Sequence, residues 1–225
     1  MALHGRSPFT RLPLPSVLDP RPFFAAQDAA YDLEDPANVP GPQVLDVIIG
    51  NDTDGASRYG VIWQEVDGTI TAAYRGTSDK PEWAEDFDVT PVETRLGQVT
   101  AGIWITYGSQ SLLSRKLLTA YKVARVVGHS RGGPLAICFS AEFGSTAIVF
   151  ACPKLVGDDV LAKSKPDCGW HMWGDVIPDL DPDWPSLPLV QRIKPPKGVG
   201  FLDVEAHHIW ENYKTAINDF YASNP

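Results

Sequence analysis

The sequence predicts a single α/β domain with a mixed, centrally parallel sheet flanked by helices. Apolar residues make up 44% and charged residues 21% of its 225 positions, proportions that are typical of a globular domain. From residue 125 onward, short apolar runs typical of buried strands alternate with helical patterns, which indicates parallel strand pairing. Before that point a strong hairpin signal indicates antiparallel strands. The sheet is therefore expected to be mixed.

The N-terminal part divides into an arm and the start of the domain. Residues 1–22 contain five prolines, and we expect them to form a surface arm with little regular structure. Residues 23–225 are then the domain. Its first predicted elements are a helix over 23–33 and strands over 44–49, 59–66 and 69–74. Asp67-Gly68, between the last two strands, is typical of a tight hairpin turn.

The C-terminal part predicts helices and strands in alternation. The expected helices cover 99–121, 134–143, 157–163 and 209–221, and the expected strands cover 125–127, 146–151 and 169–173. The last helix places its apolar side chains on one face, so it is expected to close the fold against the sheet.

Charge and composition exclude several classes of partner. The chain has 19 Lys and Arg against 28 Asp and Glu, a formal charge of −9. This charge repels phosphate backbones and anionic membrane surfaces, so no nucleic-acid partner is expected. No apolar run is long enough to span a membrane, and residues 1–22 lack the apolar stretch of a secretory signal. These observations slightly favour a cytoplasmic location over secretion, and they do not indicate an oligomeric state.

The three cysteines do not suggest a metal or redox site. Cys138, Cys152 and Cys168 are far apart and form no C-x-x-C pair, so they are interpreted as small buried hydrophobic residues. No metal or organic cofactor is expected.

A short motif indicates nucleophilic chemistry. Gly128-x-Ser130-x-Gly132 follows a predicted strand and precedes a predicted helix, which is the context of a nucleophile elbow. In so sharp a turn, side chains at 128 and 132 would collide with neighbouring backbone. The amides at the start of the helix face the site where an oxyanion would form. Ser130 is therefore the candidate nucleophile.

A serine nucleophile needs a base, and the base needs a carboxylate. Asp175 follows the strand predicted over 169–173, and His207 and His208 stand just before the final helix. The chain order Ser130, Asp175, His208 is that of the α/β-hydrolase architecture. Adjacent residues point in different directions, so only one of the two histidines can face Ser130.

Other acidic and histidine residues compete for these roles. Asp179, Asp181 and Asp183 have the alternate spacing that opens a calcium loop, but Trp184 and Pro185 stand where that loop needs a flexible glycine turn. A solvated acidic loop is the better interpretation. His129 is expected to pack or hydrogen-bond beneath Ser130, and His171 to be a satisfied histidine of the core.

Several ordered stretches carry a resemblance to a known family. They are Tyr74-Arg75-Gly76-Thr77 with Trp83 and Asp86, Gly128 to Gly133, Cys152 to Gly157, Gly174 to Pro178, and His208-Ile209-Trp210. In turn, they resemble the F-R-G-[ST] and D-W-x-x-D segments, the G-H-S-L-G-G elbow, the G-x-P-R-V-G loop, the N-D-x-V-P acid motif and the H-L-[SW] histidine motif of the class 3 lipases, the fungal-lipase-like branch of the α/β hydrolases. The spacing of the last motif favours His208 over His207.

The resemblance implies an oxyanion hole formed by the backbone amides of Thr77 and Arg131, with the Thr77 hydroxyl as a further candidate donor. Trp83 and Asp86 are expected to support the segment that carries Thr77. Arg131 departs from the family's leucine. Its guanidinium either faces a polar or anionic part of the substrate or pairs with a nearby carboxylate, and the sequence leaves both interpretations open.

The resemblance further implies a serine carboxylic ester hydrolase that acts through an acyl-serine intermediate on a small-molecule ester or lipid. Residues 78–85, where fungal relatives carry a lid helix, are short and charged and include Pro81. This favours short- to medium-chain esters over fat droplets. A true triacylglycerol lipase and a catalytically silent, hydrolase-like binding module are the alternatives.

Overall fold

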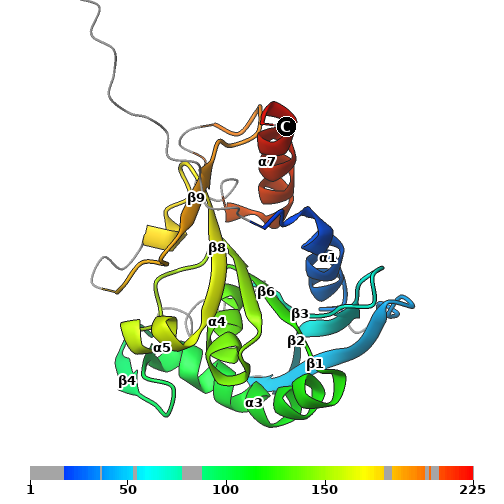
Figure 1. Ribbon diagram of the computed structural model, residues 1–225, viewed down its shortest axis with the longest axis vertical. Coiled ribbons are helices and arrows are strands. Elements are labelled where there is room, and N and C mark those ends of the chain that lie inside the picture. Colours follow the sequence, from blue (N-terminus) through cyan, green and yellow to red (C-terminus); the bar gives the residue numbers. More distant parts are fainter. Residues whose placement is uncertain are drawn as a thin grey trace, which may run out of the picture.

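A seven-stranded sheet with helices on both faces forms the core of the computed structural model (Figure 1). The structure describes residues 18–35, 37–52, 55–77, 88–179, 184–200, 203 and 208–224. The expected α/β architecture, with one mixed and centrally parallel sheet, is confirmed.

The strands of this sheet follow the order β1-β2-β3-β6-β7-β8-β9. Their bounds are β1 (Val44–Asp52), β2 (Gly55–Gln64), β3 (Ile70–Tyr74), β6 (Arg125–His129), β7 (Thr146–Phe150), β8 (Lys165–Met172) and β9 (Val190–Ile193). The first three strands pair antiparallel, and every pairing from β3 to β9 is parallel. The carboxyl ends of the five parallel strands therefore lie along one edge of the sheet.

The helices are divided between the two faces of the sheet (Figure 1). Their bounds are η1 (Arg21–Phe23), α1 (Phe24–Asp32), α3 (Ala101–Tyr121), α4 (Gly132–Phe143), α5 (Asp158–Lys163), η2 (Ile177–Asp179) and α7 (Trp210–Ser223). Helices α3, α4 and α5 contribute to one apolar cluster, whereas α1 and α7 contribute to a second cluster on the opposite face. The fold thus has three layers.

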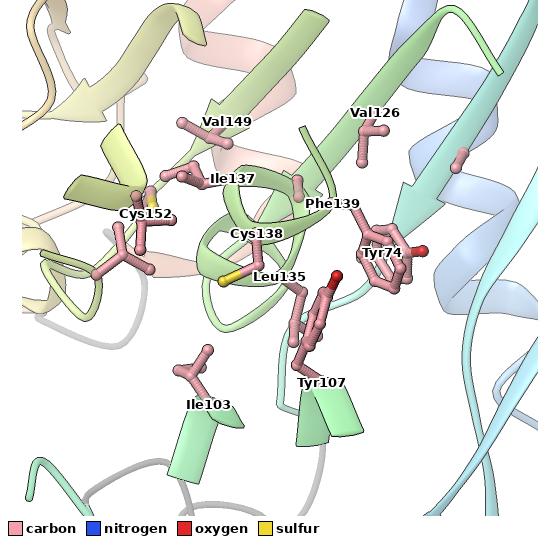
Figure 2. Close-up of a cluster of buried hydrophobic side chains, with 14 of the residues drawn as sticks. Tyr74, Ile103, Tyr107, Val126, Leu135, Ile137, Cys138, Phe139, Val149 and Cys152 are labelled. Carbon is pink, nitrogen blue, oxygen red and sulfur yellow. The ribbon is translucent and has the colours of Figure 1, made fainter. Parts of the chain in front are cut away.

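The first cluster lies between α3, α4 and the sheet (Figure 2). The rings of Tyr74 and Phe139 stack with their centroids 5.1 Å apart, and the ring of Tyr107 lies 4.7 Å from that of Phe139. Such aromatic contacts add to the free energy gained from apolar burial. This packing fixes α4, the helix that follows Ser130, against the end of β3.

The second cluster holds α1 and α7 on the other face. The Trp210 ring at the start of α7 contacts Phe150 of β7 and Phe24 of α1, with centroid distances of 5.0 and 5.5 Å. The Trp210 indole and the Lys214 ammonium both donate to Asp28 Oδ1, at 2.7 and 2.8 Å. The start of α7, directly after His208, is therefore fixed to α1 by apolar, polar and ionic contacts.

Most of the elements predicted from the sequence are confirmed. The expected hairpin between β2 and β3 forms, with the Gly68 amide donating to the Glu65 carbonyl at 2.9 Å. Because β2 ends at Gln64 and β3 begins at Ile70, its connection is longer than the two residues expected between the strands. The strand expected over 169–173 starts earlier, at Lys165. The sequence did not predict β9 or the small antiparallel pair β4 (Pro91–Glu93) and β5 (Gln98–Thr100). Such short strands carry too few residues for a clear alternation pattern.

The N-terminal arm and the three cysteines are the remaining features predicted from the sequence. Most of the expected arm, residues 1–17, lies outside the described residues, so the boundary at 22 stays an expectation. The Leu18 amide donates to Asp167 Oδ2 at 2.9 Å. All three cysteines are buried free thiols, as expected. Among the residues described, no helix is sufficiently long and apolar to cross a membrane.

Two isoleucines of α3 test the packing of the first cluster. Ile103 is fully buried, whereas Ile105 is 60% exposed. We expect Ile103→Ala to lower the free energy of unfolding by about 2–5 kcal/mol, because it leaves a cavity in a close-packed core. Ile105→Ala should change it by less than about 0.5 kcal/mol. Urea denaturation of both variants measures the difference, and equal losses would show that α3 does not pack as described.

Candidate active site

A strained turn joins β6 to α4 at Ser130. Ser130 has a φ of 55°, a left-handed conformation that costs a non-glycine residue about 1–3 kcal/mol and is over-represented at functional sites. The turn is held by the Ser130 amide, which donates to the Phe150 carbonyl at 2.9 Å, and by the Gly133 amide, which donates to the Ser130 carbonyl at 2.9 Å. The serine thus stands at the carboxyl edge of the sheet.

The glycines beside Ser130 allow backbone segments to approach one another closely. A Cβ on Gly128 would lie 2.1 Å from the Gly132 carbonyl oxygen, and a Cβ on Gly132 would lie 2.3 Å from the Tyr74 carbonyl oxygen. No side chain fits at either distance. The prediction that side chains at 128 and 132 would collide with backbone is therefore confirmed. Because no Cβ intervenes, residues 128–132 (the 128–132 turn) pack directly against the end of β3.

Ser130, His208 and Asp175 meet at this edge. His208 Nε2 lies 2.7 Å from Ser130 Oγ, and His208 Nδ1 lies 2.9 and 3.1 Å from the two carboxylate oxygens of Asp175. Because a carboxylate only accepts, Nδ1 carries the proton and donates it to Asp175, which leaves Nε2 as an acceptor for the serine hydroxyl. The side chain of Asp175 is fully buried. An arrangement of this kind can act as a nucleophile, a base and an orienting acid.

Asp175 is supported by two further donors. The Ile177 amide donates to Oδ1 at 3.0 Å, and the Tyr213 hydroxyl donates to Oδ2 at 2.7 Å. The Tyr213 oxygen in turn accepts from the Met172 amide at 2.9 Å. Burial, and the negative charge of Asp175 beside it, raise the pKa of Tyr213 well above its ordinary value, so this hydroxyl keeps its proton and donates.

Sequence patterns did not single out Tyr213 as a site residue. They place it only among the apolar side chains on one face of the helix expected over 209–221. The face assignment is correct, because Tyr213 is buried in the second cluster. Its hydroxyl reaches Asp175 only because α7 packs across the end of β8, and no local pattern encodes that contact.

Residues 75–77 (the 75–77 segment) pass directly beside Ser130. A Cβ on Gly76 would lie 2.7 Å from Ser130 Cβ. Arg75 fixes the segment: its Nε donates to the Arg58 carbonyl at 2.8 Å, and its Nη1 donates to the Gly76 carbonyl at 2.7 Å. Thr77 follows and is half-buried. The structure therefore brings the segment that carries Thr77 to the serine.

The residues expected to support this segment, and the short charged stretch where fungal relatives carry a lid helix, fall in a part of the chain that the structure does not describe. Trp83, Asp86 and residues 78–85 are outside the described residues. The expectations attached to them stay predictions.

Arg131, the other residue expected at the oxyanion hole, directly follows Ser130 and precedes the first residue of α4. Its side chain is only 1% exposed, and its guanidinium lies over the Tyr59 ring at 5.4 Å from the centroid. A cation over an aromatic face is a favourable contact. This burial does not favour the interpretation in which the guanidinium faces the substrate.

Three of the residues that compete for the site roles lie outside the described residues, namely His207, Asp181 and Asp183. The structure does describe Asp179. Asp179 accepts a hydrogen bond from Arg192 Nη2 at 3.1 Å and lies 3.5 Å from Lys154 Nζ. Partial burial raises the pKa of Asp179, but the hydrogen bond and charge of Arg192, together with Lys154, hold it below its ordinary value. Asp179 is therefore an ion-pair partner. Among the residues described, no cluster of three His, Cys, Asp or Glu side chains could hold a metal ion.

His129 and His171 are both buried, but only His129 is hydrogen-bonded as expected. Its Nδ1 lies 2.7 Å from the Tyr31 hydroxyl. In the part of the chain that the structure describes, neither ring nitrogen of His171 has a hydrogen-bond partner. The expectation of a satisfied core histidine at 171 is therefore wrong. Burial first, and then the positive charge of Arg192, lower the pKa of His171 from 6.5 to about 4, so the ring is neutral near pH 7.

The sheet order, the strand–turn–helix at Ser130 and the position of Asp175 after β8 define an α/β-hydrolase fold. Solved structures with this fold include a triacylglycerol lipase from Penicillium expansum, with a TM-score of 0.55 and 14% identity over 85% of this chain and 88% of that one. Lip2 lipase from Yarrowia lipolytica matches with a TM-score of 0.56 and 12% identity over 86% and 88%. Lipase II from Rhizopus niveus matches with a TM-score of 0.55 and 16% identity over 81% and 80%.

These similarities show that the chain has the fold of the fungal lipases. No family model matches the sequence, and no curated protein matches it at a significant level. The fold is therefore shared at low sequence identity.

A pair of Gly→Ala variants tests the 128–132 turn. Gly132→Ala forces a Cβ against the carbonyl oxygens of Tyr74 and Arg75, and we expect it to lower the free energy of unfolding by about 1–3 kcal/mol or more. Gly108 is exposed on α3, and a Cβ added there meets no atom within 4 Å, so Gly108→Ala should raise the free energy of unfolding by up to about 1 kcal/mol. Urea denaturation decides between these signs, and a neutral Gly132→Ala would refute the close approach.

The buried, neutral His171 predicts a pH dependence of stability. Unfolded histidine titrates near pH 6.5, whereas folded His171 titrates near 4. Between these values the unfolded chain binds the extra proton, so lowering the pH through this window destabilises the wild type by up to about 3 kcal/mol at this site. His171→Leu should lose less stability than the wild type between pH 6.5 and 4. Parallel pH profiles of unfolding would contradict the assignment.

Proposed function

We propose that this protein is a serine carboxylic ester hydrolase that acts through an acyl-serine intermediate. The observation that carries the proposal is the contact of Ser130 Oγ with His208 Nε2 at 2.7 Å, with His208 Nδ1 held on the buried carboxylate of Asp175. A serine hydroxyl is a weak nucleophile on its own, and a neutral imidazole at this distance can take its proton as the hydroxyl attacks.

In the proposed reaction, Ser130 Oγ attacks the ester carbonyl and its proton passes to His208 Nε2. The tetrahedral intermediate collapses as His208 returns that proton to the leaving alkoxide, which departs as an alcohol. Water then donates a proton to His208 and attacks the acyl-serine, and a second collapse releases the carboxylic acid and restores the Ser130 hydroxyl. Asp175 holds the His208 tautomer and stabilises its positive charge in both steps.

The negative charge that forms on the carbonyl oxygen needs donors beside Ser130. We assign this role to the backbone amides of Thr77 and Arg131. The assignment is supported by the contact between Gly76 and Ser130 and by the place of Arg131 just before α4. A helix N-terminus favours an anion, and losing one such donor typically costs about 2.7–4 kcal/mol of transition-state stabilisation.

The substrate is proposed to be a small-molecule ester or lipid with an apolar part. Three exposed apolar side chains, Trp173, Val176 and Ile209, are within two residues of Asp175 or His208 along the chain. The fungal proteins that share the fold are named as lipases, which supports the same class. The short charged sequence of residues 78–85 favours short- to medium-chain acyl groups.

A triacylglycerol lipase acting on long-chain lipids is the second candidate. It is favoured by the exposed apolar side chains near the site and by the fold shared with the Penicillium expansum enzyme, which is named a triacylglycerol lipase. The two candidates differ in chain-length preference and in activation at a lipid surface.

A panel of p-nitrophenyl esters from acetate to palmitate tests the function. We expect wild-type hydrolysis to be fastest on short or medium chains. We expect Ser130→Ala to lower kcat by a factor on the order of 10⁴–10⁶, because it removes the nucleophile. Ser223→Ala, at an exposed serine at the end of α7, should leave kcat unchanged. A fluorophosphonate probe should label the wild type and Ser223→Ala but not Ser130→Ala.

Other results would redirect the proposal. Maximal turnover on palmitate emulsions, rising at the interface, would assign the chain to the long-chain lipases. A folded wild type that neither hydrolyses any ester nor reacts with the probe would leave a catalytically silent, hydrolase-like binding module.

A further inference from the structure

We propose that Tyr31 is a positioning residue whose hydroxyl ties the 128–132 turn to the 75–77 segment and fixes His129 as the neutral tautomer protonated at Nε2. The inference rests on the proposed function, because it concerns how the nucleophile and the oxyanion donors keep their relative positions. Tyr31 lies in the last turn of α1, on an element that contributes no member of the proposed catalytic set.

The Tyr31 hydroxyl contacts both parts of the site. Its oxygen lies 2.9 Å from the Gly76 amide nitrogen and 2.7 Å from His129 Nδ1. Gly76 immediately precedes Thr77, and His129 immediately precedes Ser130. One hydroxyl therefore connects the residue before the proposed oxyanion donor with the residue before the proposed nucleophile.

The chemistry of the groups fixes the direction of the Gly76 hydrogen bond and favours one direction for the His129 contact, because the Tyr31 oxygen can accept twice but its proton needs an acceptor. A backbone amide can only donate, so the Tyr31 oxygen accepts from Gly76. The single hydroxyl proton is then free to be donated to His129 Nδ1, which must be unprotonated to accept it. The proton of the neutral His129 ring therefore stands on Nε2.

Burial keeps both groups in these protonation states. It raises the pKa of Tyr31 well above its ordinary value, so the hydroxyl retains its proton near neutral pH. Burial and the adjacent His208 hold the pKa of His129 well below its ordinary value, although hydrogen bonding to the His208 backbone acts in the opposite direction. The His129 ring lies 5.2 Å from that of His208. A neutral His129 does not oppose the positive charge that His208 gains during the proposed reaction.

Helix α1 is well placed to supply this connection. Gln27, one turn before Tyr31, donates from Nε2 to the Tyr74 carbonyl at 2.9 Å. Asp28 holds Trp210 and Lys214 of α7. The same helix therefore contacts the end of β3, the residue before Ser130 and the helix after His208. Of these contacts, the Tyr31 hydroxyl alone joins two of the proposed catalytic segments directly.

The test removes the hydroxyl and keeps the ring. Tyr31→Phe retains the edge-on packing on His129, whose centroid is 5.9 Å away, but it loses both hydrogen bonds. We expect kcat for p-nitrophenyl butyrate to fall on the order of tenfold with KM within twofold, because donors that are less well fixed weaken transition-state stabilisation more than substrate binding. Tyr121→Phe, at the end of α3, is the matched control and should keep the wild-type kcat.

Two variants at His129 examine the other end of the contact. His129→Asn keeps an acceptor near the position of Nδ1 and should retain more of the wild-type kcat than His129→Leu, which has none. Both changes remove the same buried imidazole ring. The melting temperatures of the two variants therefore show whether their difference in kcat simply follows a difference in stability.

The tautomer is measured independently of activity. Long-range ¹⁵N–¹H NMR of the imidazole rings, assigned with His129→Asn, should show wild-type His129 protonated at Nε2 only. In Tyr31→Phe the proton should be shared between the two nitrogens. A proton on Nδ1 in the wild type, an unchanged kcat in Tyr31→Phe or a loss confined to KM would each overturn the inference. A wild type that hydrolyses no ester would refute the proposed function instead, while the NMR result would still decide the tautomer.

Discussion

Close packing of backbone against backbone around Ser130 is the constraint on which the rest of the structure depends. Gly128 meets the carbonyl of Gly132, and Gly132 meets the carbonyl of Tyr74, at distances that no side chain could occupy. These contacts hold Ser130 in its left-handed conformation and bring the end of β3 alongside it. Because the parallel strands end at the same edge of the sheet, Asp175 after β8 lies within reach of the same place.

The buried carboxylate of Asp175 imposes the second constraint. A charge taken out of water is costly unless hydrogen bonds replace its solvation. Here His208, Tyr213 and the Ile177 amide supply those donors. Tyr213 and Trp210 are also apolar contacts of α7 with the sheet. The packing that buries α7 therefore also orients His208, so stability and site geometry depend on the same side chains.

Helix α1 lies on the face of the sheet opposite α4 and contacts both the 128–132 turn and the start of α7. Its buried alanines pack on the sheet, while Gln27, Asp28 and Tyr31 reach the end of β3, the start of α7 and the 128–132 turn. A helix that provides no proposed catalytic group thus contacts the 75–77 segment, the 128–132 turn and the start of α7. Such contacts keep proposed catalytic groups at fixed separations, which is what a transition state requires of them.

Periodicity and glycine sterics act between near neighbours, so the sequence alone predicted most of the helices and strands in order, the hairpin near Asp67-Gly68 and the turn at Gly128-x-Ser130-x-Gly132. It also proposed Ser130, Asp175 and His208 as site residues, and those roles remain predictions. Contacts between distant parts of the chain bring these three side chains together. The same packing places Tyr213 against Asp175 and Tyr31 against His129. It also buries Arg131 and leaves His171 without a partner among the described residues. Those outcomes depend on contacts across tens of residues of chain, which form only when α1 and α7 pack on the sheet.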